Sequence, residues 1–313
     1  MEPGTVKRTV AKGVLLNTAI LFCTGMIPIF GFFFALLLPL SILCQRIRLG
    51  KRTGAIVLAL SVGVLVLFFG ATSFDGLFFI ELMVLGYVLG EAFDRRYPIE
   101  KTFLFTDGIV LGSGLGVLMV YGVFSGAGFG EMISGYVARN LEATVSIYEN
   151  VGMPEETMNA VKASMDQIRN VLTHILPSLA VSSVMFITWI TVLLVRPICH
   201  RWKLPAPEIG ALKVWRAPEG LVWGVIACGV MLMFLKGNGR LLAVNGLIFF
   251  MTIYFFSGMA IVSFYFDKKR FPMAMRVMIY VLIGLQQVLL LVVIVIGFFD
   301  MWLNFRKLEI SQK

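Results

Sequence analysis

The sequence predicts an all-α integral membrane protein, a polytopic bundle of about nine transmembrane helices, or about eight, with an amphipathic helical segment outside the membrane. Composition is the first reason, because 58% of the 313 residues are hydrophobic and only 14% are charged, a balance that soluble domains do not show. The second reason is that the hydrophobic residues form runs close to the roughly 20 residues that a membrane-spanning helix needs.

The positive charges support the same class. Most Lys and Arg residues lie in short segments between the apolar runs, where they act as orientation signals. The formal net charge of +9 therefore does not indicate nucleic-acid binding, and the lipid bilayer is the expected surroundings of the chain.

Nine apolar runs are the predicted spans. In chain order they cover residues 10–27, 29–44, 53–70, 74–93, 102–124, 171–195, 221–235, 241–266 and 273–299. Pro28 and Gly31 separate the first two, because proline cannot continue the hydrogen-bond ladder of a helix and glycine permits a turn. The seventh run is short for a span, so eight spans are the alternative.

Residues 125–170 are the one long water-compatible interruption of the apolar sequence. Their acidic residues outnumber the basic ones, although the whole chain is basic. Apolar residues recur there at helical spacing in two stretches, and Gly152 and Pro154 separate these into two amphipathic helices. The apolar faces of such helices can lie on the membrane or on a partner protein.

The distribution of positive charge sets the expected orientation. With nine spans and a cytoplasmic N-terminus, most basic residues fall on the cytoplasmic side and segment 125–170 is extracytoplasmic. Eight spans satisfy the rule about as well. The chain then divides into a six-span N-terminal bundle at 1–195 that includes the 125–170 insert, a cytoplasmic basic loop at 196–219, and a three-span region with a tail at 220–313.

Glu81 is the clearest candidate for a functional residue, because it lies well inside the predicted span 74–93. A carboxylate in the hydrocarbon costs about 2.5–3.5 kcal/mol on insertion scales. One hypothesis is a proton- or cation-responsive group, or a ligand contact, that faces the bundle interior. The other is a structural hydrogen bond to a neighbouring span, and the sequence favours neither.

Asp107, Asn17 and Asn245 complete the candidates for a ligand or ion site. Asp107 lies near a predicted cytoplasmic end, where an interfacial salt bridge is the simpler interpretation. The two asparagines lie within apolar runs, where interhelical hydrogen bonds, worth about 0.6 kcal/mol on average, explain them without a function.

Gly108, Gly112 and Gly116 recur on one face of the predicted span 102–124. Small residues at this spacing let helix backbones approach closely, so helix packing is a better interpretation than a surface for a ligand. The sequence contains no nucleotide-binding fingerprint, no metal-ligand spacing and no nucleophile–base pair. We therefore expect no cofactor, no metal site and no enzymatic activity.

The final third of the chain carries the most specific pattern. It consists of Trp215-Arg-Ala-Pro218, then Asn245-Gly246, then Asp300-Met-Trp302 followed by Arg306. This pattern resembles the YybS-like family of predicted bacterial membrane proteins, a domain-of-unknown-function family, and the likeness extends over almost the whole chain. The resemblance implies a bacterial inner-membrane protein with no established activity to inherit.

The first six predicted spans are similar to the substrate-binding subunits of energy-coupling-factor transporters, and to the rod-shape membrane protein MreD. The features that carry this likeness are the break at Pro28, Pro39 in the second run, a basic loop with Gly50 and Gly54, and the glycine-rich fifth run. The transporter likeness implies a small-molecule ligand, a transmembrane coupling partner and ATPases.

Two hypotheses for the function follow. The first is a transporter-like protein that binds or translocates a small molecule, with an ATPase module as a partner. The alternative is a non-catalytic membrane scaffold of a cell-envelope complex, similar to MreD, whose partners are other membrane proteins.

Overall fold

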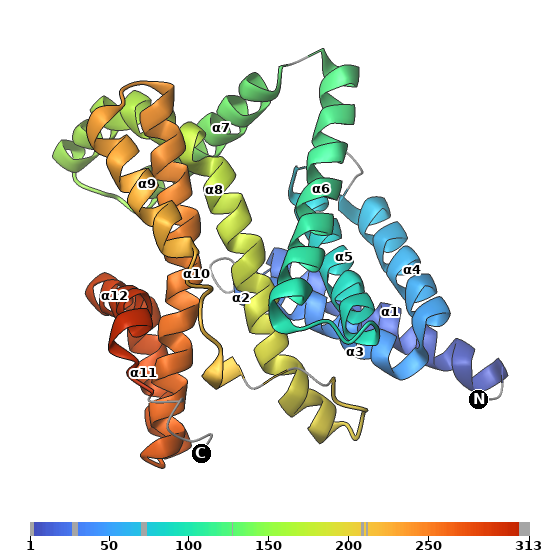
Figure 1. Ribbon diagram of the computed structural model, residues 1–313. Helices are drawn as coiled ribbons and strands as arrows, with labels where there is room; N and C mark the ends of the chain where they lie inside the picture. The colour runs from blue at the N-terminus through green and yellow to red at the C-terminus, as the bar shows by residue number, and fades with distance from the viewer. Residues whose placement is uncertain are drawn as a thin grey trace. The chain divides into compact units, whose positions relative to one another are not determined.

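The computed structural model describes residues 3–26, 31–69, 74–126, 128–207, 210 and 212–306 (Figure 1). All regular secondary structure in these ranges is helical, which confirms the predicted all-α class. The chain forms two compact units, Met1–Val117 with Ser183–Gly210 and Leu118–Ser182 with Ala211–Lys313. The domain boundaries expected from the sequence, after residues 195 and 219, stay predictions.

Six of the described helices are long and apolar enough to cross a membrane. They are α1 (Pro3–Met26), α4 (Lys51–Phe69), α5 (Phe74–Asp94), α6 (Ile99–Ser125), α8 (Glu155–Arg201) and α10 (Asn238–Lys268). A seventh crossing is reached if α11 (Met273–Leu285) and α12 (Gln287–Leu303) count as one bent span. The protein is therefore a multi-pass membrane protein, but the predicted count of nine spans is not confirmed.

The predicted second span, 29–44, is not one long helix. α2 (Gly31–Ala35) and α3 (Leu37–Leu49) take its place. The 13 residues of α3 rise only about 20 Å, less than a hydrocarbon core of about 30 Å. Gly50 ends α3 with a φ of 81°, which glycine adopts without strain. The predicted break at Pro28 lies outside the described residues.

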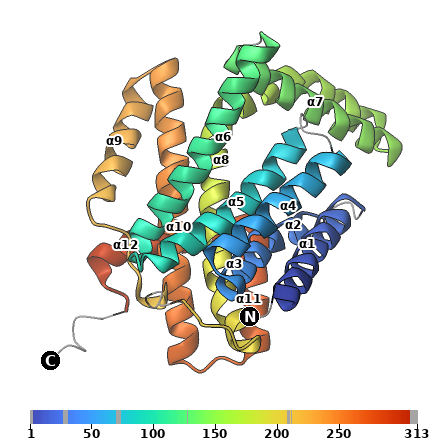
Figure 2. The same cartoon turned by 90° about the vertical axis from the view of Figure 1, so that its right-hand side faces the viewer.

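α3 is central to the first unit, since it packs against α1, α4 and α5 (Figure 2). Leu38, Ile42 and Leu65 are among the side chains buried between these helices. α3 and α5 approach closely at Gly86, where an added Cβ would collide with the carbonyl oxygen of Pro39. This is the close backbone approach that small residues permit in membrane helices.

The interruption predicted at 125–170 contains α7 (Phe129–Asn150) and the start of α8. Gly152, with a φ of 76°, lies between the two helices, as the sequence predicted. The second predicted amphipathic helix is not a separate element that ends near residue 170. It is the start of α8, which has 47 residues and continues to Arg201. A helix of that length extends about 70 Å, more than twice the thickness of the hydrocarbon core. Part of α8 must therefore lie outside any span that it forms.

In the second unit α10 packs against both α9 (Leu221–Phe234) and α12. Two glycines lie where α10 crosses α12. An added Cβ on Gly258 would collide with the carbonyl oxygen of Val293, and one on Gly297 with that of Tyr254. α9 has 14 residues and rises only about 21 Å, so the seventh predicted run is shorter than a full span.

The last predicted span, 273–299, is broken. α11 ends at Leu285, α12 begins at Gln287, and the two helices are bent by 101°. Gln286 at the break has extended backbone angles, φ −100° and ψ 108°. The run is therefore a bent helix pair and not one straight helix.

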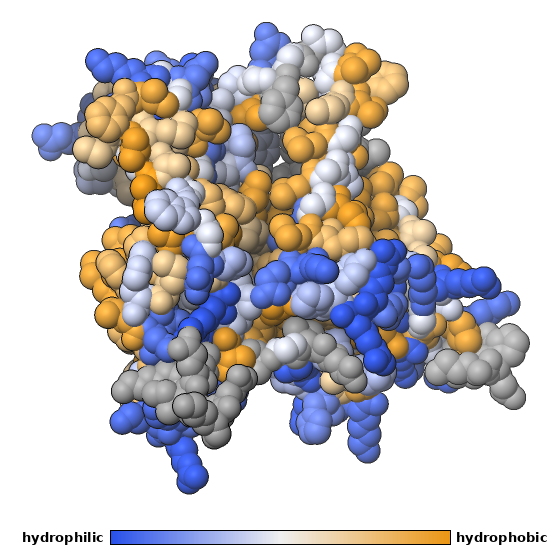
Figure 3. Space-filling model, viewed as in Figure 1, coloured by the Kyte–Doolittle hydropathy of each residue, from blue (hydrophilic) through white to orange (hydrophobic). Residues whose placement is uncertain are grey.

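Apolar residues cover much of the helix sides in the space-filling view (Figure 3). The exposed large apolar side chains include Leu67, Phe68, Leu104, Phe124, Met233 and Phe234. Contiguous apolar surface of this extent is rare on soluble monomers. These faces are the ones expected to contact lipid or another membrane protein.

Candidate functional site

Glu81 lies in α5 and its side chain is directed at α6. The hydroxyl of Ser113 on α6 lies 3.0 Å from Glu81 Oε2 and 3.3 Å from Oε1. Gly114 lies beside the carboxylate, since an added Cβ there would be 3.6 Å from Glu81 Oε1, an ordinary contact distance. The sequence singled out Glu81 as a candidate but did not identify Ser113 as its partner, because one serine in a glycine-rich run provides no distinct signal.

Asp107 lies in α6 and is only 6% exposed. Thr188 on α8, which is fully buried, donates a hydrogen bond from Oγ1 to Asp107 Oδ1 at 2.6 Å. The interfacial salt bridge expected as the simpler interpretation is not formed among the described residues, where Thr188 is the hydrogen-bond partner of Asp107. Thr188 was not identified from the sequence, where it lies within the apolar run 171–195.

The two carboxylates have one property in common, because each is hydrogen-bonded by a neutral hydroxyl. A hydroxyl can donate to a carboxylate, and it can also accept a hydrogen bond from a carboxylic acid. Both protonation states of Glu81 and Asp107 can therefore keep their partner. α6 carries Asp107 and Ser113 six residues apart, a rise of about 9 Å along the helix, so the two acids lie at different depths of the first unit.

Asn17 on α1 is fully buried within a polar network that also involves α3 and α4. Its Nδ2 donates to Ser61 Oγ at 2.9 Å, and its Oδ1 accepts from Ser41 Oγ at 2.7 Å. Gln45 Nε2 donates to the same Oδ1 at 3.1 Å. Both polar atoms of Asn17 are thus used between helices, which favours the interhelical interpretation. A ligand role for Asn17 stays a prediction.

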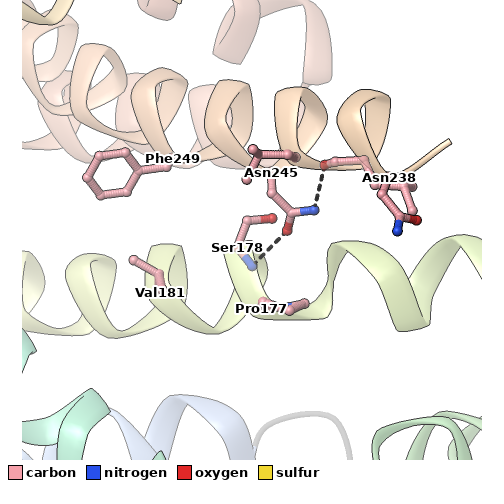
Figure 4. A pocket seen from close by; sticks show the side chains of 8 residues that line it. Pro177, Ser178, Val181, Asn238, Asn245 and Phe249 are labelled. Atoms are coloured by element: carbon pink, nitrogen blue, oxygen red, sulfur yellow. Dashed lines mark hydrogen bonds between the residues drawn. The ribbon is translucent and has the colours of Figure 1, made fainter. Parts of the chain in front are cut away.

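Asn245 on α10 faces α8 next to Pro177 (Figure 4). Its Oδ1 accepts from the backbone N–H of Ser178 at 3.2 Å. Its Nδ2 donates to the carbonyl oxygens of His174 and Leu241, each at 2.9 Å. The amide therefore joins the backbones of two helices, and a ligand role for Asn245 also stays a prediction.

Part of the family pattern at the end of the chain forms a buried ionic cluster. Asp300 and Arg306 are 1% and 2% exposed, and Arg306 Nη2 pairs with Asp300 Oδ2 at 2.7 Å. Arg306 Nη1 donates to the backbone oxygen of Trp215 at 2.8 Å. Arg216 Nε lies 3.4 Å from the same Asp300 oxygen. The cluster thus joins the loop before α9 to the end of α12.

The other pattern residues build the second unit at separate places. The carbonyl oxygen of Pro218 accepts a hydrogen bond from the first residue of α9. Gly246 allows α10 to approach α9, because an added Cβ would lie 2.6 Å from Cys228 Sγ. Trp302 is 54% exposed and its ring lies 5.4 Å from that of Phe298. The pattern therefore does not gather into one binding site.

The glycine stripe of α6 lies open. Apart from the backbone of α6 itself, no heavy atom of the described residues comes within 4 Å of a Cβ added at Gly108, Gly112 or Gly116. Within the described chain the close helix contacts use other glycines, such as Gly86 and Gly258. The packing role of the stripe stays a prediction, and it requires a neighbouring helix from elsewhere.

Arg46 was not singled out by the sequence, where it belongs to a basic segment typical of an orientation signal. In the structure this arginine of α3 is 3% exposed. Its Nη2 lies 2.8 Å from Glu91 Oε2 and 2.7 Å from Asp94 Oδ2. Its Nη1 donates to the carbonyl oxygen of Tyr87 at 3.2 Å. Gly90 of α5 leaves space for this guanidinium, because an added Cβ there would collide with Arg46 Nη1.

No group of three or more His, Cys, Asp or Glu side chains among the described residues could hold a metal ion. The intramembrane polar groups instead occur as pairs of a carboxylate with a hydroxyl, and as amide networks. Such groups can bind a proton, a cation or a polar part of a ligand.

These observations define a class, a multi-pass all-helical membrane protein with ionisable groups inside its candidate spans. The chain belongs to the family described as "Predicted membrane protein (DUF2232)", whose model matches residues 16–301. It is 23% identical over 311 residues to the "Uncharacterized protein YybS" of Bacillus subtilis (strain 168). The aligned region covers 96% of this chain and 97% of that protein. No solved structure matches the chain. The resemblance to the YybS-like family is confirmed, whereas the likeness of the first six runs to transporter subunits and MreD stays a prediction. Neither description names an activity.

Proposed function

We propose that this protein is a bacterial inner-membrane protein that binds or translocates a small molecule or ion, with Glu81 and Asp107 as the groups that exchange a proton or bind a cation. The observation that carries the proposal is that two carboxylates lie in helices able to cross a membrane, each beside a neutral hydroxyl. The proposal includes the orientation expected from the positive charges, with a cytoplasmic N-terminus and an extracytoplasmic segment 125–170.

The argument rests on the cost of a buried charge. A carboxylate inside the membrane costs about 2.5–3.5 kcal/mol on insertion scales, and it is stabilised there by a proton, a cation or a basic partner. The hydrogen bonds of Glu81 and Asp107 in the structure come from Ser113 and Thr188, which carry no charge. A proton or a bound cation is therefore the natural means of neutralising them. Intramembrane acids of this kind often mark transport pathways.

The test is native mass spectrometry of the full chain, gently released from its own membrane with no ligand added. Wild-type protein is compared with Glu81→Gln and Asp107→Asn, which keep the side-chain size and remove the ionisable group. Glu142→Gln is the matched control, because Glu142 is exposed on α7, outside the candidate spans. We expect a discrete small-molecule adduct on wild type and control that is lost from at least one of the two variants. A wild-type protein with neither an adduct nor an ATPase partner, or an equal adduct on all four proteins, would overturn the proposal.

A scaffold is the second candidate, and the open glycine stripe of α6 favours it. Small residues on an unoccupied face of a span suit a helix from another membrane protein, and Gly108, Gly112 and Gly116 have no such neighbour in the described chain. The same native mass spectra distinguish the two candidates. A stoichiometric protein partner without an adduct indicates a scaffold, unless that partner is an ATPase assembly, which belongs with a transporter.

A further inference from the structure

An apolar groove lies between α8 and α10 in the second unit (Figure 4). It is a shallow hollow of about 630 Å³ that is wide open to its surroundings. Pro177 and Val181 of α8 form one wall, and Leu241, Leu242 and Phe249 of α10 form most of the other. The groove is separate from Glu81 and Asp107, which belong to the first unit.

The length of the groove matches one leaflet of a bilayer. Its lining begins at Asn238, the first residue of α10, and reaches Phe249. These 11 steps along a helix rise about 16 Å, roughly half of a hydrocarbon core of about 30 Å. A chain that enters at the start of α10 and follows the groove would therefore end near the middle of the membrane.

The groove offers little to a polar solute. Its wall is mostly apolar, and the polar groups at its centre bind each other, because Asn245 accepts from Ser178 N–H and donates to two backbone oxygens. Leu242 is 65% exposed beside it, which adds apolar surface at the rim. A flexible hydrocarbon chain is the occupant that such a lining suits.

Positive charge lies at the end of the groove where α10 begins. Lys236 and Arg240 flank Asn238 and are exposed, and among the described residues neither forms an ion pair with an Asp or Glu. The N-terminus of α10 has no side-chain cap, so its first N–H groups add to the positive potential. An anionic group held at this end would meet two cations.

We propose that this groove binds one acyl chain of an anionic phospholipid, with the headgroup phosphate beside Lys236 and Arg240. The apolar lining and the length of one leaflet favour an acyl chain. The cations at the end where α10 begins favour an anionic lipid over an uncharged or zwitterionic one. The lipid would also cover the side of α8 that carries Pro177.

The binding test uses purified full-length protein, depleted of lipid by detergent exchange and titrated with phosphatidylglycerol or phosphatidylcholine of identical acyl chains. Native mass spectrometry counts the bound lipids. We expect one tight phosphatidylglycerol and weaker phosphatidylcholine binding. Each of Lys236→Gln and Arg240→Gln should weaken the phosphatidylglycerol about fivefold, as expected for one cation near a lipid surface. Lys269→Gln, a cation at the other end of α10, is the matched control and should change nothing.

A second variant tests the acyl chain. Leu242→Trp places a larger side chain on the rim of the groove, at an exposed position that tolerates it, and should weaken both lipids. Thermal unfolding of each variant without lipid confirms that it is folded, and if Leu242→Trp is not folded the two charge variants decide alone. The proposal would be overturned if wild type bound the two lipids with equal affinity, or if Lys236→Gln and Arg240→Gln left phosphatidylglycerol binding unchanged. A protein copurified on this face of the groove would also overturn it.

Discussion

The side chain of Asn245 on α10 accepts a hydrogen bond at 3.2 Å from the backbone N–H of Ser178 on α8, directly after Pro177. In a regular helix the N–H of residue 178 pairs with the carbonyl of residue 174, and Asn245 Nδ2 donates to that carbonyl at 2.9 Å. Asn245 thus bridges the two backbone groups of one helical turn. Pro177 itself removes the bond to the carbonyl of residue 173, so Asn245 supports the next pair of groups along α8, and such support from a neighbouring helix helps a membrane helix to tolerate proline.

We predict that Asn245→Leu destabilises the protein by about 1–3 kcal/mol, because it removes the hydrogen bonds of Asn245 to the N–H of Ser178 and to the carbonyl of His174. The measurement is equilibrium unfolding in detergent, followed by circular dichroism. Asn140→Leu is the control, since the Asn140 side chain on α7 is exposed and bonds only to a carbonyl of its own helix. Equal stability of the two variants would contradict the bridging role of Asn245.

Pro177 and Gln286 show that the sequence alone does not predict where a helix breaks. Pro177 is the stronger breaker by its chemistry, yet it lies inside the continuous helix α8. Gln286, which carries no strong breaking tendency, lies at a bend of 101°. The difference is tertiary. Asn245 on α10, 67 residues from Ser178 in the sequence, supplies hydrogen bonds to the turn of α8 that contains Pro177. Hydropathy and length predicted the class of fold, but not which runs stay straight.

We predict a large difference between two cations that share one carboxylate. Arg46 and Lys51 both pair with Glu91, at 2.8 and 2.9 Å, but their side chains are 2% and 62% exposed. Arg46→Ala removes a buried cation and its charged hydrogen bonds to two partly solvated carboxylates, and it should destabilise the protein by about 1.5–3 kcal/mol. Lys51→Ala removes a solvated pair and should cost at most about 1 kcal/mol. The comparison is made by unfolding in detergent, and similar losses for both would show that burial does not decide the strength of this cluster.

We predict strong coupling between Asp300 and Arg306. Either Asp300→Asn or Arg306→Met leaves a buried charge in poorer surroundings, so each should destabilise the second unit by about 3–5 kcal/mol. The double variant removes both charges and should lose much less than the sum of the two. A double-mutant cycle measured by unfolding gives the coupling energy. Additive losses would mean that the 2.7 Å pair contributes little to stability and that Arg216 compensates for it.

The candidate site was predicted in part, and the missing part has a physical reason. Glu81 and Asp107 are recognisable in the sequence because charged groups are rare in apolar runs. Their partners Ser113 and Thr188 are small polar residues that occur commonly in spans, so only the fold identifies them. Asp300 and Arg306 were identified by their family pattern, whereas the backbone of Trp215 as a partner depends on how the loop before α9 folds.

The two kinds of glycine provide the final prediction. Gly258 lies where an added Cβ would collide with the backbone of α12, while the Cβ of a residue at 112 would meet no neighbouring atom of the described chain. Gly258→Ala should therefore destabilise the protein by about 1–3 kcal/mol through overpacking. Gly112→Ala should leave the isolated chain unchanged or stabilise it by up to about 1 kcal/mol, because alanine favours the helix.

Thermal unfolding of the monodisperse chain checks both variants, and Gly112→Leu extends the test to a large side chain. If the stripe packs within this chain, as the sequence suggested, Gly112→Leu destabilises the isolated protein. If it packs against a partner, the variant is as stable as wild type in isolation and loses the partner in native membranes. The open position of Gly112 predicts the second result, because a leucine there has no helix of the described chain to push away.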